Sequence, residues 1–265
     1  MISLGAVLVD FLFRLTFGVA IAMGLTSSRW VTSGFFRVHL WVLMGLQTFA
    51  ALVLYSLRAE YAGRAPALIG VAIAAAVVSY VGAVIWMYES ARAGKIALGL
   101  IAALAAVGCL LSEAKGTDTL TLAAILRGGD WFTSGLALGS IITAMLLGHW
   151  YLNSPGMRMA PLERLLLLIA VALALRAVWS GGGAILEVLH ASGSGRQLRT
   201  QFYLFLALRW LAGMVGPAFM AELTRRTLLI PNTQSATGIL YAATILVFIG
   251  ELCSRLLSVA TTYPV

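Results

Sequence analysis

The chain has 265 residues, of which 61% are apolar and 11% are charged, and its mean hydropathy is +0.96. Soluble domains carry roughly 45 to 50% apolar and about 25% charged residues, so this composition excludes a water-soluble globular protein and indicates an integral membrane protein. A net charge of +8 would suggest nucleic acid in a soluble protein. In a membrane protein, basic residues mark short loops and contact the lipid bilayer, so no nucleic-acid partner is expected.

A membrane-spanning helix needs roughly 20 predominantly apolar residues. Runs of this kind predict eight spanning helices, and hence an all-α polytopic bundle that forms a single transmembrane domain over residues 1–265. In chain order they cover residues 3–26, 35–57, 66–88, 95–112, 131–153, 162–186, 201–222 and 235–258. The segment 118–127 is too short to span, so it is expected to lie at the interface or to extend the fifth helix. The first run lacks a basic leading region and a cleavage pattern, which predicts a retained span rather than a signal peptide.

The orientation is predicted from Lys and Arg in alternate loops, because cytoplasmic loops carry the excess of these residues. The odd-numbered loops contain Arg29, Arg37, Arg92, Lys95, Arg158, Arg164, Arg225 and Arg226. The even-numbered loops contain Arg58, Arg64, Lys115, Arg127, Arg196 and Arg199, to which Arg255 near the end of the last helix can be added. This small bias favours odd loops in the cytoplasm and both termini outside, in a bacterial cytoplasmic (inner) membrane.

Glycine and proline predict where helices approach each other or break. Gly135 and Gly139 in the fifth helix have the GxxxG spacing that allows close helix packing. The glycines at 181–183 in the sixth helix, and Gly216 followed by Pro217 in the seventh, predict a kink or an unwound turn.

Ionisable residues within the spans are the main functional signal, because each costs about 2.5 to 3.5 kcal/mol on insertion scales and therefore needs a partner or a role. The residues expected to form a buried ion network or a proton route are Asp10, Arg14, Arg176, Arg209, Glu222, Glu251 and Arg255. Asp10 and Arg14 are four residues apart, as are Glu251 and Arg255, so each pair is expected to neutralise itself on one helical face. Arg176 and Arg209 have no acid at this spacing, and Glu251 is a candidate partner across helices.

Two histidines are expected at one depth near the odd loops. His39 follows the predicted start of its helix by about four residues and His149 precedes its helix end by about four, so both lie roughly 6 Å inside the helix ends. This shared depth would allow them to contact one ligand. The other members of this candidate quinone-binding set are Trp86, Tyr151 and Asn153.

From the fifth helix onward, the order of features resembles the membrane anchor subunit of dimethyl sulfoxide reductase. The matching residues are Gly135, Gly139 and Gly148 in the fifth helix, Arg209 and Trp210 in the seventh, and the run Ile249, Gly250, Glu251, Leu252, Cys253, Ser254 and Arg255 in the eighth. The resemblance covers the C-terminal half. It implies an eight-helix, haem-free, quinol-handling subunit of the polysulfide-reductase type, with partner subunits that carry iron-sulfur or other redox centres.

The first functional hypothesis is therefore a membrane subunit of a respiratory oxidoreductase complex, which anchors iron-sulfur or cytochrome subunits and exchanges electrons with menaquinone or ubiquinone. A quinone needs an apolar slot, hydrogen-bond donors to its carbonyl oxygens and groups that exchange protons, and His39 or His149 would serve as such a donor.

Three alternatives remain open at this point. In a b-type cytochrome, His39 and His149 would ligate one haem b. In a small-solute transporter, Arg176 and Arg209 would be the binding cations, beside the breaks in the sixth and seventh helices. The third alternative is a purely structural membrane subunit. Phosphate-loop, nucleophile-elbow and zinc-protease motifs are absent from the sequence, so it predicts no hydrolytic residues.

Overall fold

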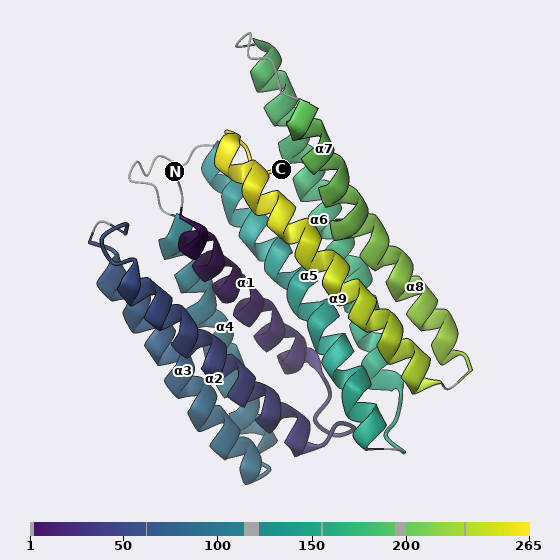
Figure 1. Cartoon of the computed structure of the whole chain (residues 1–265). Helices are drawn as coiled ribbons and strands as arrows, with labels where there is room; N and C mark the ends of the chain where they lie inside the picture. Colours follow the sequence, from purple (N-terminus) through teal and green to yellow (C-terminus); the bar gives the residue numbers. More distant parts are fainter. Residues whose placement is uncertain (1–2, 62, 114–121, 155, 194–199, 231) are drawn as a thin grey trace.

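The computed structural model describes residues 3–61, 63–113, 122–154, 156–193, 200–230 and 232–265. Eight helices in this part of the chain are long and apolar enough to span a membrane, which confirms the predicted all-α polytopic bundle (Figure 1). The elements are α1 (Leu4–Leu25), α2 (Ser33–Ser56), α3 (Ala65–Met87), α4 (Ala91–Glu113), α5 (Leu122–Asn153), α6 (Ala160–Gly193), α7 (Thr200–Trp210), η1 (Leu211–Val215), α8 (Gly216–Leu228) and α9 (Thr233–Ala260). α7, η1 and α8 together form the seventh span.

α1 and α5 lie at the centre of the bundle. Each has 72% of its most apolar window buried, more than any other span. α1 packs on α2, α4 and α5, whereas α5 also packs on α6 and α9. A Cβ atom on Gly18 would collide with the Gly135 carbonyl oxygen, and one on Gly139 with the backbone of Gly18. The predicted small-residue contact is therefore confirmed, with α1 as the partner helix.

The two ends of the bundle are distinct. α1 begins at the end where α2 and α3 are connected, and we call this the even-loop end; the connection between α1 and α2 lies at the opposite, odd-loop end (Figure 1). α6 and α7 extend further than the other helices at the even-loop end (Figure 1).

The fifth and seventh spans follow the expectations, whereas the sixth lacks an unwound turn. Residues 122–127 extend α5, whereas residues 118–121 of the same predicted segment lie outside the described residues. In the seventh span, a π-helical turn directly precedes Gly216 and Pro217. A proline ring clashes with the carbonyl group four residues earlier, and a π-helical turn is one way to accommodate it.

The unwound turn predicted as one possibility at 181–183 is absent, since α6 is continuous through these glycines. Glycine weakens a helix but does not remove a backbone donor, as proline does. Two of these glycines instead face close neighbours, because the Trp210 ring lies near Gly181 and the Pro264 carbonyl oxygen lies against Gly183.

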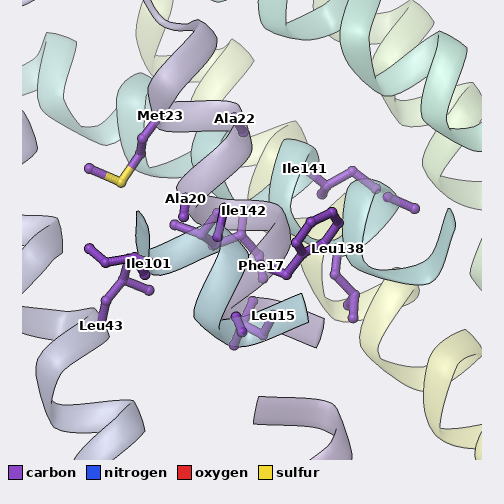
Figure 2. Close-up of a cluster of buried hydrophobic side chains, with 14 of the residues drawn as sticks. Leu15, Phe17, Ala20, Ala22, Met23, Leu43, Ile101, Leu138, Ile141 and Ile142 are labelled. Atoms are coloured by element: carbon purple, nitrogen blue, oxygen red, sulfur yellow. The ribbon is translucent and has the colours of Figure 1, made fainter. Parts of the chain in front are cut away.

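An apolar core fills the space between α1, α2, α4 and α5 (Figure 2). It includes the buried side chains of Leu15, Phe17, Leu43, Ile101, Leu138 and Ile141. On α1 these residues follow Arg14, and on α5 they follow Asp130. These side chains therefore lie on the odd-loop side of the two charged residues, and their close packing provides the dispersion contacts that hold helices together in lipid.

Candidate functional site

Arg14 on α1 contacts three carboxylates from three helices. Its Nε lies 2.9 Å from Asp10 Oδ2, its Nη1 lies 2.8 Å from Asp130 Oδ2 on α5, and its Nη2 contacts Glu113 at the end of α4. The guanidinium group can make these contacts at once because its N–H donors point outward in one plane. Arg14 thereby joins α1, α4 and α5.

Arg176 on α6 forms the second centre of the network. Its Nη1 lies 2.5 Å from Asp130 Oδ1, while its Nε and Nη2 donate to the two oxygens of Glu251 at 2.9 and 3.0 Å. The predicted pairing of Arg176 with Glu251 across helices is therefore present, with the bidentate geometry of strong Arg–carboxylate pairs. Ser134 also donates to Glu251 (2.6 Å), and Ser254 accepts from Arg176 (3.2 Å).

Arg255 on α9 does not pair with Glu251 as expected. Its Nη1 lies 2.9 Å from Asp10 Oδ2 and its Nη2 lies 2.5 Å from Asp130 Oδ2, whereas Glu251 binds Arg176. A spacing of four residues brings two side chains near each other, but in this interior several carboxylates compete for each arginine. Arg255 therefore connects α9 to α1 and α5.

The buried ion network contains one more acid than base. Its members are Asp10, Arg14, Glu113, Asp130, Arg176, Glu251 and Arg255. Four carboxylates face three guanidinium groups, so the fully ionised network carries one net negative charge. The buried guanidinium group of Arg209 interacts electrostatically with Glu251 and Asp130 of this network and offsets this negative charge.

Sequence reasoning missed two members of this network, Asp130 and Glu113. Asp130 contacts all three arginines of the network, Arg14, Arg176 and Arg255. Both acids lie within one residue of the predicted helix ends, at 131 and 112, so they were read as loop residues. The available signal was the excess of arginines within the spans, which required additional acids close by.

Glu222 lies outside the ion network, contrary to the expectation, whereas Arg209 interacts electrostatically with Glu251 and Asp130 but forms no ion pair with them within the described residues. Arg209 is 1% exposed and donates to Ser180 on α6, while its Nε and Nη2 have no hydrogen-bond partner within the described part of the chain. Glu222 lies in the middle of α8, where its 40% exposed side chain pairs with Arg225 and Arg226, each at 2.7 Å. Its neighbours at i+3 and i+4 neutralise it locally.

A cavity of about 510 Å³ opens beside the network at the even-loop end. It lies within the range of roughly 300 to 1,000 Å³ that is typical of small-molecule sites. Its wall combines network residues with apolar side chains and with residues that follow α9. Its lining includes Asp10, Tyr61, Glu113, Arg255, Ser258 and Tyr263.

Tyr61 provides a neutral donor at this cavity. It lies in the connection between α2 and α3, outside the spanning helices. Burial, together with the carboxylates of Asp10 and Glu60, raises the pKa of Tyr61 to about 12. Its hydroxyl group therefore keeps its proton at neutral pH and can donate a hydrogen bond.

The two predicted ligand histidines have different surroundings at the odd-loop end. The buried ring of His39 donates from Nδ1 to the Phe35 carbonyl oxygen (2.7 Å) and lies 6.3 Å from the Trp150 ring, measured between centroids. His149 is exposed, and its Nδ1 lies 3.4 Å from the Tyr241 hydroxyl group. Neither histidine lines the cavity described above.

The other members of the histidine set also have separate contacts. Trp86 stacks on Phe36 at 4.1 Å between ring centroids. Tyr151 donates to the Arg158 carbonyl oxygen (2.5 Å), and Asn153 is exposed at the end of α5. In contrast to the ion network, these contacts do not link the five residues, although His39 and His149 are near enough to interact electrostatically.

Comparison of this chain with known protein families, with curated proteins and with solved structures finds no match. The function is therefore inferred from the geometry of the ion network and its cavity.

Proposed function

We propose that the protein is an integral membrane subunit of a respiratory oxidoreductase complex and that it binds a quinone or quinol in the cavity beside the ion network. The observation that carries this proposal is the placement of a cavity of about 510 Å³ directly against Asp10, Glu113 and Arg255. The carboxylates that would accept protons thus line the cavity that would hold the small molecule.

The cavity wall has the groups that a quinone requires. A quinone ring is planar and uncharged, so it needs apolar contacts and a donor to each carbonyl oxygen. Tyr61 and Arg255 offer donors, and Ala6 and Val7 of α1 offer apolar surface. This combination favours a neutral ligand with hydrogen-bonding oxygens.

The carboxylates would receive the protons of quinol oxidation. That half-reaction gives a quinone, two protons and two electrons. Asp10 or Glu113 would accept the first proton and would pass it to water at the mouth of the cavity before the second. The electrons would go to an iron-sulfur or cytochrome centre on a partner subunit.

The long helices α6 and α7 offer this partner a surface near the cavity. α6 has 34 residues, or about 51 Å at about 1.5 Å per residue, whereas the hydrocarbon core of a bilayer is about 30 Å thick. The excess lies at the even-loop end (Figure 1), where Leu189 and Leu204 are exposed. The proposed electron acceptor would therefore dock at the same end as the quinone.

The test is quinone binding by the purified protein in lipid nanodiscs. Short-chain ubiquinone and menaquinone analogues are titrated against the parent protein and against Tyr61→Phe, which keeps the ring but loses the donor. Losing this hydrogen bond should cost about 1 to 3 kcal/mol, or roughly 5- to 150-fold in affinity. Tyr88→Phe is the matched control, because Tyr88 is exposed at the odd-loop end.

The outcomes separate the possibilities. An affinity that falls in Tyr61→Phe but not in Tyr88→Phe supports the proposal. Quinone binding that is equal in both variants places the ligand elsewhere. The absence of saturable quinone binding by the parent protein rejects the proposed function.

A further inference from the structure

The segment that follows α9 folds back and forms one wall of the cavity. Residues Thr261–Pro264 line the cavity, and Val265 is fully buried against Phe202 and Leu257. Since Phe202 belongs to α7 and Leu257 to α9, the segment Thr261–Val265 is held between these helices. We call it the tail segment.

Glu187 on α6 binds the backbone of the tail segment. Its Oε2 accepts hydrogen bonds from the N–H groups of Thr262 (2.9 Å) and Tyr263 (3.0 Å). The Glu187 side chain is fully buried, and hydrogen bonds to a buried carboxylate are stronger than those between neutral groups. The ring of His190, one turn further along α6, packs edge-on against Tyr263 at 5.9 Å.

Gly183 allows the tail segment to reach α6. It lies one turn before Glu187, and a Cβ atom at this position would collide with the Pro264 carbonyl oxygen. A Cβ atom on the adjacent Gly182 would meet nothing within 4 Å. The absence of a side chain at position 183 is therefore a requirement of this contact.

The tail segment is also connected to the ion network. Ser254 donates to the Val265 carbonyl oxygen (2.9 Å) and accepts a hydrogen bond from Arg176 (3.2 Å). Val265 at one end of the segment is thus linked to the network through Ser254, while Thr261–Pro264 line the cavity. A displacement of the segment would change both.

We propose that Glu187 is a positioning residue that fixes the tail segment as a wall of the cavity, with Gly183 admitting the segment, and thereby controls the access of water and ligand to the ion network. The identity of the ligand rests on the proposed function, whereas the positioning itself does not. Glu187 acts through the backbone of Thr262 and Tyr263, and it is not one of the proton-accepting carboxylates described above.

Cysteine labelling tests this role without any quinone. Ser258 lines the cavity and its Oγ has no hydrogen-bond partner in the described part of the chain, so Ser258→Cys is a mild reporter. The native Cys109 and Cys253 are buried and should label slowly. A charged, membrane-impermeant maleimide is applied to Ser258→Cys alone and combined with Gly183→Ala, Gly182→Ala or Glu187→Ala.

Glu187→Ala removes the charge-assisted hydrogen bonds to the tail segment, and Gly183→Ala displaces the segment by a steric clash with Pro264. Both variants should raise the labelling rate by about tenfold or more, because the loss of such hydrogen bonds changes an opening equilibrium by at least this factor. Gly182→Ala should label like the parent. Equal rates in Gly183→Ala and Gly182→Ala would overturn the proposal. If Gly183→Ala does not yield folded protein, Glu187→Gln decides in its place, because the amide oxygen still accepts hydrogen bonds and should give a rate between those of the parent and Glu187→Ala.

Quinone titration of the same variants distinguishes this proposal from the proposed function. If both are right, Gly183→Ala weakens quinone binding and Gly182→Ala does not. If labelling changes but the parent binds no quinone, the positioning role stands and the cavity serves another ligand.

Discussion

At the residue scale, the defining feature is the use of arginine rather than lysine inside the bundle. Arg14, Arg176 and Arg255 each contact more than one carboxylate, which a planar fork of donors permits and a single ammonium group satisfies less well. Asp130 in turn accepts from all three. The network therefore cross-links helices from both halves of the chain.

Removing the central arginine should destabilise the protein strongly. Arg14→Gln leaves Asp10, Glu113 and Asp130 short of a cation, and breaking a buried pair in this way costs about 3 to 5 kcal/mol. Arg225→Gln is the control, because its partner Glu222 is accessible to solvent and the change should have little effect. Thermal unfolding in detergent, followed by size-exclusion chromatography, measures both. Equal midpoints for the two variants would contradict the structural role of Arg14.

Tyr61 should ionise only at very high pH. Its pKa of about 12 exceeds the ordinary value of 10.0 because burial and the carboxylates of Asp10 and Glu60 disfavour the phenolate. In the unfolded chain Tyr61 would lose its proton near pH 10, so its ionisation favours unfolding between about pH 10 and 12. The difference in phenolate absorbance between the parent and Tyr61→Phe should therefore appear near pH 12. A difference signal near pH 10 would show that Tyr61 is accessible to water.

At the element scale, the contact of α1 with α5 determines how closely the two halves of the bundle approach. Gly18, Gly135 and Gly139 bring two backbones together where any side chain would collide with the opposite helix. This contact positions Arg14 of α1 beside Asp130 of α5. The geometry of the ion network therefore depends on the close packing of α1 against α5 at these glycines.

An added methyl group at this contact should separate the helices. Gly139→Ala places a Cβ against the Gly18 backbone, which cannot move aside as a flexible side chain can. Overpacking of this kind costs about 1 to 3 kcal/mol. Gly45→Ala on α2 is the control, since its Cβ would have no neighbour within 4 Å. The midpoint of thermal unfolding should fall for Gly139→Ala only, and an unchanged midpoint would argue against this close approach.

The sequence predicts the eight spans because a helix that crosses a bilayer must be predominantly apolar along its length. All eight spans were found from apolar runs of about 20 residues. α5 and α6 are longer than expected, since a helix continues into polar residues once it leaves the apolar layer. Pro217 identified the irregular turn in the seventh span, whereas the glycines at 181–183 did not predict structure because glycine alone does not break a helix.

The candidate site was only partly predictable. The pairing of Arg176 with Glu251 followed from the lack of a local acid. The roles of Asp130 and Glu113 did not, because no local pattern tells which helices a residue near a helix end will face. The tail segment was missed for a similar reason, since a hydrogen bond between a side chain and a distant backbone leaves no periodic signal.

At the scale of the whole molecule, the ion network and its cavity belong to one end of the bundle. The α1 and α5 side chains labelled in Figure 2 follow Arg14 and Asp130 along their helices, so this apolar layer lies between the network and the odd-loop end. The cavity opens beside the network at the even-loop end, so the proposed proton exchange with water would occur on that side of the membrane. Which compartment this is depends on the orientation of the chain.

The distribution of basic residues predicts that the cavity faces away from the cytoplasm. Odd loops carry the small excess of Lys and Arg, so the even-loop end should be outside. Glu60→Cys, at the even-loop end, should react with an impermeant maleimide in intact spheroplasts, whereas Ser28→Cys, at the odd-loop end, should react only after the membrane is permeabilised. The reverse pattern would place the cavity in the cytoplasm.

The separation of the two ends also predicts how the histidines behave. His39 and His149 lie at the odd-loop end, away from the cavity, so His39→Phe and His149→Phe should leave quinone affinity at the cavity unchanged, as expected for sites without shared partners. His39 is buried beside Trp150, whereas His149 is exposed beside Tyr241, so we expect no haem held between them. The measurements are quinone titration and the reduced-minus-oxidised spectrum of purified protein. A b-type band that is lost in both variants would establish the cytochrome alternative, and a parallel loss of quinone binding would move the quinone site to the histidines.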